Sequence, residues 1–436
     1  MLKKLTIEKL SHDGRGIARL EGKTLFVAGA LTGESVTAKL IKSHKRFDEY
    51  KAINIEQAST QRTEPTCSHY DNCGGCQLQH LSAEGQREHK QSAAVELIQR
   101  SSTLTAQKIL PSIHNAGFGY RSRARLSAWY QNNEYRIGFR EHASKNIINI
   151  EHCPILHTQL DKLLPALAEL CAQLKLGKDL GHIDLQLHEP NADMLQAALS
   201  LRVMKVFSDE QHTILQAFAK KHDCLVNVQE NKKDVISAVQ AQPMQYKLPE
   251  QKLAINFNWG DFTQANRLLN RHMVSRAIEL LQLKNTDKVL DGFCGLGNFS
   301  LAIAQQAESV IGVEGSHSMT QHAETNATLN GIDNISFSHR NLMDADSLKT
   351  LSKKKFNKAL IDPPRDGAKE LCEMLCKHKV ERLVYVSCDP ANLARDAKIL
   401  AAGKYQLESL YINDMFPQSS HSEVTACFTY TAKKKV

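Results

Sequence analysis

The sequence lacks several features that would place it in a common class of protein. No stretch approaches the ~18–20 uncharged apolar residues that a membrane-spanning helix requires. The amino-terminal segment MLKKLTIEKLSHDG has no apolar core of the kind found in secretory signals, so we expect a cytoplasmic protein with no membrane partner. A Gly-Lys-Thr triplet at 22–24 is excluded as a phosphate-binding loop, because five residues and not four separate it from Gly16.

The composition is that of a globular protein with a basic bias. A length of 436 residues favours two or three domains, and 42% of the residues are hydrophobic. The net charge is +8, and residues 1–57, with 11 Lys/Arg and 7 Asp/Glu, carry half of it, which indicates a polyanionic partner. In a reducing compartment the eleven cysteines are expected to be reduced, and clusters among them indicate metal or catalytic sites more often than disulfides.

The hydrophobic patterning divides the chain into three parts. Residues 1–58 show five short strands with glycine-containing turns, which predicts a small OB-like β-barrel of the kind that binds oligonucleotides. Residues 59–250 mix helical and strand patterns, which predicts an α+β central domain. In residues 251–436 helices alternate with apolar strands, which predicts a Rossmann-like α/β domain with a parallel sheet. The patterning leaves open on which domain the helix that begins near residue 83 packs.

Four cysteines of the central part have metal-ligand spacing. The segment CSHYDNCGGC contains Cys67, Cys73 and Cys76, and Cys153 precedes a proline 77 residues later. Three close thiols and a distant fourth suit a tetrahedral zinc ion or a [4Fe-4S] cluster. If the metal is zinc, His69 or His80 could replace one thiolate. The spacing predicts a metal site and leaves its metal open.

A glycine loop of the third part has the features of a cofactor site. In KVLDGFCGLGNFS an apolar strand runs into Asp291 and then into a loop with Gly295 and Gly297. Twenty-three residues beyond Asp291, Glu314 ends the next strand, where an acidic side chain can accept hydrogen bonds from ribose hydroxyls. The spacing is not that of a dinucleotide loop, so the pair favours S-adenosylmethionine, which has a free ribose and no phosphate.

Two further strands end in groups that suit chemistry on a pyrimidine. Asp362 precedes two prolines in IDPP, and Cys388 follows an apolar run in VYVSCDP. A thiolate that adds to C6 of uracil makes C5 a nucleophile toward a methyl sulfonium, and removal of the C5 proton then expels the thiolate. Asp362 can accept the N3–H of uracil, which cytosine lacks. Glu423 follows in the chain and could be the base.

Five motifs together resemble the RNA uracil-5 methyltransferase family. In order they are FTQANRLLN, DGFCGLGNFS, IDPPRDGA, VSCDPANLARD and DMFPQSSHSE, and they cover essentially all of residues 260–430. Two departures occur: Gly292 stands where the family often has leucine, and QSSHSE replaces a PHTxHVE-like ending. The resemblance implies a methyltransferase fold for residues 251–436 and a TRAM domain for residues 1–58.

The resemblance also implies the roles of individual residues. Cys388 is the expected nucleophile and Glu423 the expected proton acceptor. Members of the family that act on large-subunit ribosomal RNA carry this cysteine pattern with a [4Fe-4S] cluster, which implies 23S ribosomal RNA as the partner of a monomeric enzyme. The expected cluster ligands are Cys67, Cys73, Cys76 and Cys153. The expected contacts with S-adenosylmethionine are Gln264, Phe293, Asn298, Glu314, Asn341 and Asp362.

Three other readings are weaker. An RNA cytosine-5 methyltransferase usually has a cysteine beside the proline that follows Asp362, and this chain has none there. A radical S-adenosylmethionine enzyme requires a CxxxCxxC triad, which the cysteine spacing does not match. A non-catalytic iron–sulfur RNA-binding factor would not need Cys388, Glu423 and the cofactor loop together.

Overall fold

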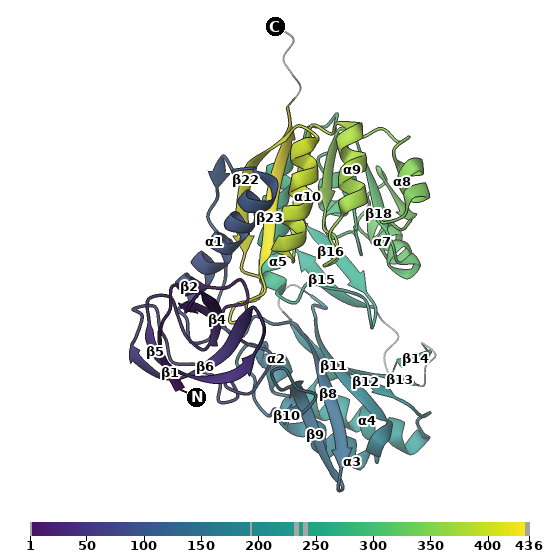
Figure 1. Ribbon diagram of the computed structural model, residues 1–436. Helices are drawn as coiled ribbons and strands as arrows, with labels where there is room; N and C mark the ends of the chain where they lie inside the picture. Colours follow the sequence, from purple (N-terminus) through teal and green to yellow (C-terminus); the bar gives the residue numbers. More distant parts are fainter. Residues whose placement is uncertain (1, 192–193, 231–234, 239–242, 432–436) are drawn as a thin grey trace.

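The computed structural model describes residues 2–191, 194–230, 235–238 and 243–431. Its strands form a barrel sheet, a central sheet, a two-stranded hairpin and a carboxy-terminal sheet (Figure 1). Within the described residues no helix is both long enough and apolar enough to cross a membrane.

The amino-terminal sheet is curled into a small barrel (Figure 1). Its strand order is β1-β5-β6-β4-β3-β2, and alternate residues such as Leu25, Val27 and Val36 point into a core of their own. The first predicted strand is divided in two, because β1 stops before Ile7 and β2 begins after Glu8. The strands are β1 (Leu2–Thr6), β2 (Lys9–Leu10), β3 (Gly16–Leu20), β4 (Lys23–Ala28), β5 (Ser35–Ser43) and β6 (Phe47–Gln57).

The central sheet mixes strands with short helices, as an α+β domain does. Its order is β10-β9-β8-β11-β12-β13-β14, in which only β12 and β13 pair in parallel. Its strands are β8 (Arg123–Gln131), β9 (Glu134–Arg140), β10 (Ile147–Asn149), β11 (Leu180–His188), β12 (Gln196–Val203), β13 (Cys224–Glu230) and β14 (Val235–Ala238). The helices beside it are α2 (Thr158–Asp161), α3 (Leu167–Gln173) and α4 (Asp209–His222).

The carboxy-terminal sheet has the order β19-β18-β17-β20-β21-β23-β22-β7. Its first five strands are parallel, and β23 runs antiparallel between β21 and β22. The strands are β17 (Lys288–Gly292), β18 (Ser309–Glu314), β19 (Ile335–His339), β20 (Lys358–Ile361), β21 (Arg382–Ser387), β22 (Tyr405–Asn413) and β23 (Glu423–Tyr430). The helices are α5 (Arg267–Leu281), α6 (Ser300–Ala304), α7 (His317–Leu329), α8 (Ala345–Leu351), α9 (Lys369–His378) and α10 (Pro390–Ala402).

The middle strands of this sheet are buried along their whole length because both faces are covered. Every residue of β20 and β21 is buried, as expected for strands between two layers of helices. The hairpin β15 (Met244–Leu248) and β16 (Leu253–Phe257) packs into the same hydrophobic core as α5 and β17.

Helix α1 (Ala83–Ser102) packs on the carboxy-terminal sheet. Ala94 and Ile98 on its inner face are buried in the core that contains α9, α10 and β22. The short strand β7 (Lys108–Ile109) then joins the edge of the sheet beside β22. The helix contacts α10 and β22, and Figure 1 shows it beside them. The domain limits themselves, 1–58, 59–250 and 251–436, stay predictions.

Candidate active site

The acidic and thiol side chains singled out in the sequence come to one edge of the carboxy-terminal sheet. Asp291, Glu314, Asp362 and Cys388 lie at or just beyond the carboxyl ends of parallel strands, which meet at the same edge. Glu423 begins β23, and because this strand is antiparallel to β21 its first residue lies at that edge too. The topology therefore builds one site from five separate chain segments.

The glycine loop after β17 is bound directly to Glu314. The backbone N–H of Gly295 donates to Oε2 of Glu314 (3.0 Å), and the N–H of Ser316 donates to Oε1 (2.8 Å). Gly297 has φ of 90°, which favours glycine, and Phe293 adopts φ of 63° at the start of the turn. A carboxylate has about four lone-pair sites, so Glu314 keeps acceptor capacity for the two hydroxyls of a ribose.

Asp291, on β17 directly before this loop, is a second acidic residue of the site. It is fully buried, Ser300 donates a hydroxyl hydrogen bond to its Oδ2, and its Oδ1 has no partner among the described residues. Burial, with the charges of Asp362 and Glu314, raises the pKa of Asp291 to about 7. Three acidic groups in this small space favour a positively charged ligand.

Asn298 is held by two residues to which sequence analysis gave no role. Asn270 and Asn298 exchange amide hydrogen bonds of 2.9 and 3.0 Å, and the Tyr246 hydroxyl donates to Oδ1 of Asn298 (3.1 Å). Asn270 was visible as the last residue of FTQANRLLN, whereas Tyr246, on the separate hairpin, gave no sequence signal. Both fix the amide that the resemblance assigns to the cofactor.

Two other expected cofactor contacts lie on the rim of the site. Asn341 is exposed just beyond β19, and its Oδ1 accepts the backbone N–H of Met343 (3.0 Å). Gln264 is half-buried, and its carbonyl accepts a hydrogen bond from the Ser122 hydroxyl of the central domain (3.4 Å). Their contacts with a cofactor stay predictions, as do those of Phe293, Asn298, Glu314 and Asp362.

Cys388 is fixed between β21 and α10 by a tight turn. The Asp389 side chain caps α10, accepting the backbone N–H groups of Ala391 (2.9 Å) and Asn392 (3.0 Å). Pro390 occupies the first helical turn, where its missing N–H costs nothing. The Cys-Asp-Pro sequence thus ends the strand and starts the helix with the thiol at the junction.

The electrostatics of Cys388 show which groups surround it. Burial raises its pKa to about 11, the negative charges of Glu423 and Asp362 add to this, and Arg365 opposes it. Burial and the charge of Asp362 likewise raise the pKa of Glu423 well above its ordinary value. Asp362 is half-buried, and burial of its carboxyl raises its pKa to about 7. The charges of both carboxyls therefore act on the thiol, and Arg365 is a neighbouring cation that sequence analysis missed.

The four cysteines of the central part gather in one region. Burial raises the pKa of Cys76 to about 11, with smaller effects from the thiols of Cys73 and Cys67. Cys153 is buried, and its pKa is raised to about 12 by burial, again with effects of Cys76 and Cys67. In the part of the chain that the structure describes, no three His, Cys, Asp or Glu side chains are close enough to hold a single ion. The thiols are neighbours, but they do not form a tight tetrahedral site.

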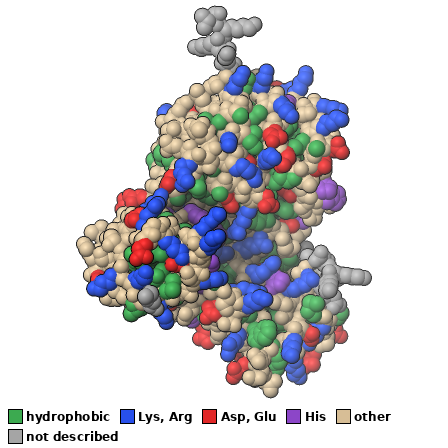
Figure 2. Space-filling model, viewed as in Figure 1, with side chains coloured by type: hydrophobic (Ala, Val, Ile, Leu, Met, Phe, Trp, Pro, Cys, Tyr) green, Lys and Arg blue, Asp and Glu red, His purple; other side chains and the backbone are tan. Residues whose placement is uncertain are grey.

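The basic residues of hairpin β8–β9 are partly engaged within the protein. Arg125 forms hydrogen bonds with Asp184 (2.8 and 3.1 Å), and Arg123 donates to the carbonyl of Asp261 (2.7 Å). Arg125 nevertheless keeps 59% of its side chain exposed. Figure 2 shows Lys and Arg side chains gathered around the hollow where the barrel, the central domain and the carboxy-terminal domain meet. This hollow has the charge expected of a surface for a polyanion.

Family models match nearly the whole chain. The model described as tRNA (uracil-5-)-methyltransferase matches residues 84–430, and the TRAM domain model matches residues 3–58. The amino-terminal barrel is thus a TRAM domain, as the sequence predicted.

Curated relatives are similar over their full length. The chain is 40% identical to the 23S rRNA (uracil(1939)-C(5))-methyltransferase RlmD of Shewanella halifaxensis, covering 97% of this chain and 95% of that protein. The RlmD proteins of Shewanella sediminis and Legionella pneumophila strain Lens are 42% and 39% identical over 97% of this chain and 95% and 96% of their own lengths.

A solved structure has the same fold. The Pyrococcus abyssi tRNA (uracil-54, C5)-methyltransferase, in complex with S-adenosyl-L-homocysteine, superposes with a TM-score of 0.75 at 23% identity, over 98% of this chain and 100% of that one. This likeness confirms the methyltransferase fold of the carboxy-terminal domain. The chain belongs to the tRNA (uracil-5-)-methyltransferase family.

Proposed function

We propose that this protein transfers a methyl group from S-adenosylmethionine to C5 of a uridine in 23S ribosomal RNA. The target would be the uridine equivalent to uracil 1939, which the names of its RlmD relatives specify. The observation that carries the proposal is the meeting of Cys388, Asp362 and Glu423 at one sheet edge. Beside them lies the glycine loop that is hydrogen-bonded to Glu314.

The residues of the site fit the chemistry of uracil. The thiolate of Cys388 adds to C6, and Asp362 accepts the N3–H and so selects uracil over cytosine. The cofactor supplies an electrophilic methyl group on a positively charged sulfonium, whose charge favours the ionised forms of nearby acids. Glu423 then removes the C5 proton, the C5–C6 double bond re-forms, and the C6–S bond breaks to return the thiolate.

The cysteines of the central domain would hold a [4Fe-4S] cluster, because their spacing suits one and the family resemblance implies it. The thiol of Cys67 acts on the pKa of Cys73, Cys76 and Cys153, so the four thiols lie in one region. A cluster would hold the cysteine segment in shape by joining it to Cys153.

The remaining parts would hold the RNA. The TRAM barrel and the basic hollow of Figure 2 supply charge for the phosphate backbone, while the buried site requires the target base to leave its stack. In this proposal the protein works as a monomer in the cytoplasm, where ribosomal RNA is made.

The proposal is tested by mapping the product. The purified protein is incubated with S-adenosylmethionine and a 23S rRNA transcript that carries no modifications, and the RNA is then digested and analysed by mass spectrometry. We expect one 5-methyluridine, in the fragment equivalent to that around position 1939 of the relatives' substrate. Methylation elsewhere, or of cytosine, would contradict the proposed target.

A further inference from the structure

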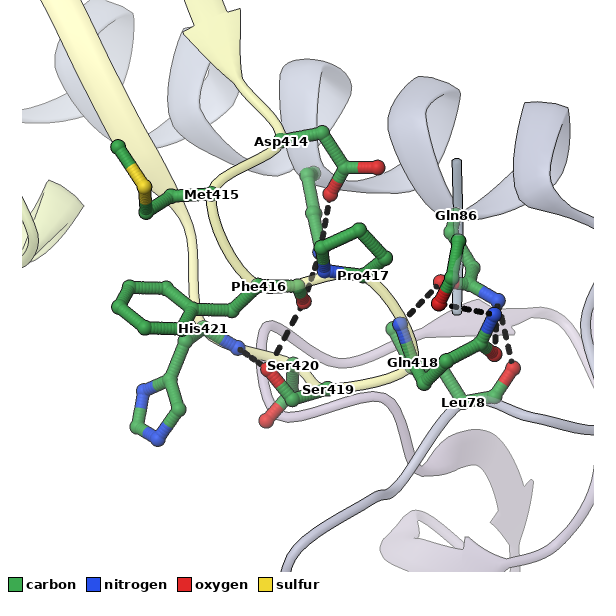
Figure 3. A network of polar contacts seen from close by, with 12 residues as sticks. Leu78, Gln86, Asp414, Met415, Phe416, Pro417, Gln418, Ser419, Ser420 and His421 are labelled. Carbon is green, nitrogen blue, oxygen red and sulfur yellow. Dashed lines mark hydrogen bonds and ion pairs between the residues drawn. The ribbon is translucent and has the colours of Figure 1, made fainter. Parts of the chain in front are cut away.

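The loop between β22 and β23 ends at the catalytic base but is not held by the sheet alone. It spans residues 414–422 and contains the first five residues of the QSSHSE departure from the family pattern, whose last residue is Glu423 at the start of β23. Figure 3 shows that helix α1 and the segment around Leu78 contact this loop, although both are more than 300 residues away in the chain. Its order therefore depends on the amino-terminal half of the chain.

Gln418 is the centre of these contacts. Its backbone has φ of 70°, a left-handed conformation that non-glycine residues adopt only where their surroundings impose it. Its N–H donates to Oε1 of Gln86 (2.8 Å), while its Oε1 accepts from Nε2 of Gln86 (3.0 Å). Its carbonyl accepts the N–H groups of both Gln77 and Leu78 (2.9 Å each). Every one of these partners lies outside the carboxy-terminal sheet.

Gln77 and Leu78 directly follow Cys76, so the cysteine segment itself touches the loop. Oε1 of Gln77 also accepts the N–H of Ser420 (3.3 Å). Gln86, which is 1% exposed, joins the cysteine segment to the loop, because its Nε2 also donates to the carbonyl of Leu78 (3.0 Å). The cysteine segment, α1 and the loop thus share one continuous set of hydrogen bonds.

A second, charged contact fixes the start of the loop. Nζ of Lys90 lies 2.8 Å from Oδ1 of Asp414 and donates to the carbonyl of Phe416 (3.0 Å). The side chains of Lys90 and Asp414 are only 1% and 4% exposed. Removing one partner of such a buried pair strands the other charge, which is far more costly than removing both. Neither residue has a part in the chemistry described above.

We propose that Gln86 and Lys90 are positioning residues that hold loop 414–422, and through it the carboxyl of Glu423, where proton abstraction requires it. This inference rests on the proposed function. Glu423 acts only after the methyl group is on C5, so a displaced loop should spare formation of the C6–S bond and slow its breakage. A small misplacement of a catalytic group can slow a step by about a hundredfold.

Three variants test this inference on the full-length protein. Gln86→Leu removes the hydrogen bonds to Gln418 without adding charge, and Lys90→Met removes the buried cation at similar volume. The double variant Lys90→Met with Asp414→Asn also removes the stranded carboxylate. The matched controls make the same kinds of change at exposed residues. They are Gln99→Leu on α1 and Lys398→Met on α10. Rates of adduct formation and of product release are measured in single turnovers on ordinary uridine RNA, with thermal unfolding in parallel.

In wild type and controls the adduct should form and decay without accumulating. In Gln86→Leu and Lys90→Met we expect a denaturation-resistant protein–RNA adduct to accumulate, with release slowed roughly tenfold to a hundredfold and formation changed less than about threefold. The double variant should regain folding stability relative to Lys90→Met but keep slow release. Equal slowing of both steps, or release that recovers together with stability, would show a merely structural role and overturn the inference.

The same experiment separates this inference from the proposed function. If wild-type protein forms no adduct even with 5-fluorouridine RNA, the methylation mechanism itself fails. If wild type forms that adduct while the variants release ordinary product at the wild-type rate, only the positioning role fails.

Discussion

At the scale of single residues, the site is built around a thiol that is neutral in the unliganded protein. Cys388 is surrounded by Asp362 and Glu423 and enclosed by the sheet edge, so its pKa is raised to about 11. Only a small fraction of the thiol is then thiolate at neutral pH. As long as the pH is below the pKa, this fraction increases about tenfold for each unit by which the pH rises. A positive charge that enters the site would lower this pKa and so raise the fraction of thiolate.

The alkylation of Cys388 should therefore depend on pH and on Glu423. In protein without cofactor, the rate of labelling by iodoacetamide at this residue should rise about tenfold per unit from pH 7 to 10, because only the thiolate reacts. Glu423→Gln removes a negative neighbour, so the pKa of Cys388 should fall and labelling at pH 8 should become faster. Labelling is followed by peptide mass spectrometry.

The matched control is Glu381→Gln. Glu381 is an exposed residue just before β21, whereas Cys388 follows the opposite end of that strand. It should leave the labelling rate unchanged. Labelling that is already pH-independent above pH 7, or that slows in Glu423→Gln, would contradict the electrostatic account.

The residues proposed to carry the chemistry could be singled out from the sequence because they stand in local patterns. Asp362 precedes two prolines and Cys388 precedes Asp-Pro, so each marks a strand end within a few letters of sequence. Lys90 and Asp414 could not be paired in this way. They are 324 residues apart, and a single lysine on a helix is ordinarily exposed, so only the fold reveals that it is buried.

At the scale of elements, strand and helix types followed from periodicity, but packing partners did not. The alternation of apolar strands and helices predicted the parallel sheet that β17 to β21 form. Helix α1 is polar over most of its surface, and its buried positions, such as Ala94 and Ile98, suit either neighbouring domain. Its place beside β22 depends on contacts with residues at the other end of the chain.

The cysteine segment offers a test at the scale of elements. Anaerobically purified protein should contain iron and acid-labile sulfide in equal amounts, and Cys153→Ser should lose most of both, because the fourth ligand closes the site. Cys171→Ser, which changes a buried cysteine elsewhere in the central core, is the matched control and should retain them. Bound zinc without iron would contradict the cluster, and iron retained in Cys153→Ser would contradict its ligand set.

At the scale of the whole molecule, several hydrophobic cores surround one hollow. The barrel and the central sheet each have a cluster, and the carboxy-terminal sheet packs into two, one of which includes Ala198 of the central sheet. Basic side chains gather where Figure 2 shows the hollow. The sequence predicted the parts and the excess charge of residues 1–57. It could not predict their relative placement, which depends on polar contacts such as those of Gln418 between distant segments.

The central claim is that Cys388 of this chain forms a covalent adduct with uridine during methyl transfer. The most direct measurement uses S-adenosylmethionine and a 23S rRNA fragment containing 5-fluorouridine, because fluorine at C5 cannot leave as a proton and the adduct cannot decay. We predict a denaturation-resistant complex, methylated at C5 and attached through Cys388, that is absent with Cys388→Ala. No complex, in protein shown to bind both the cofactor and the RNA, would contradict the thiolate mechanism.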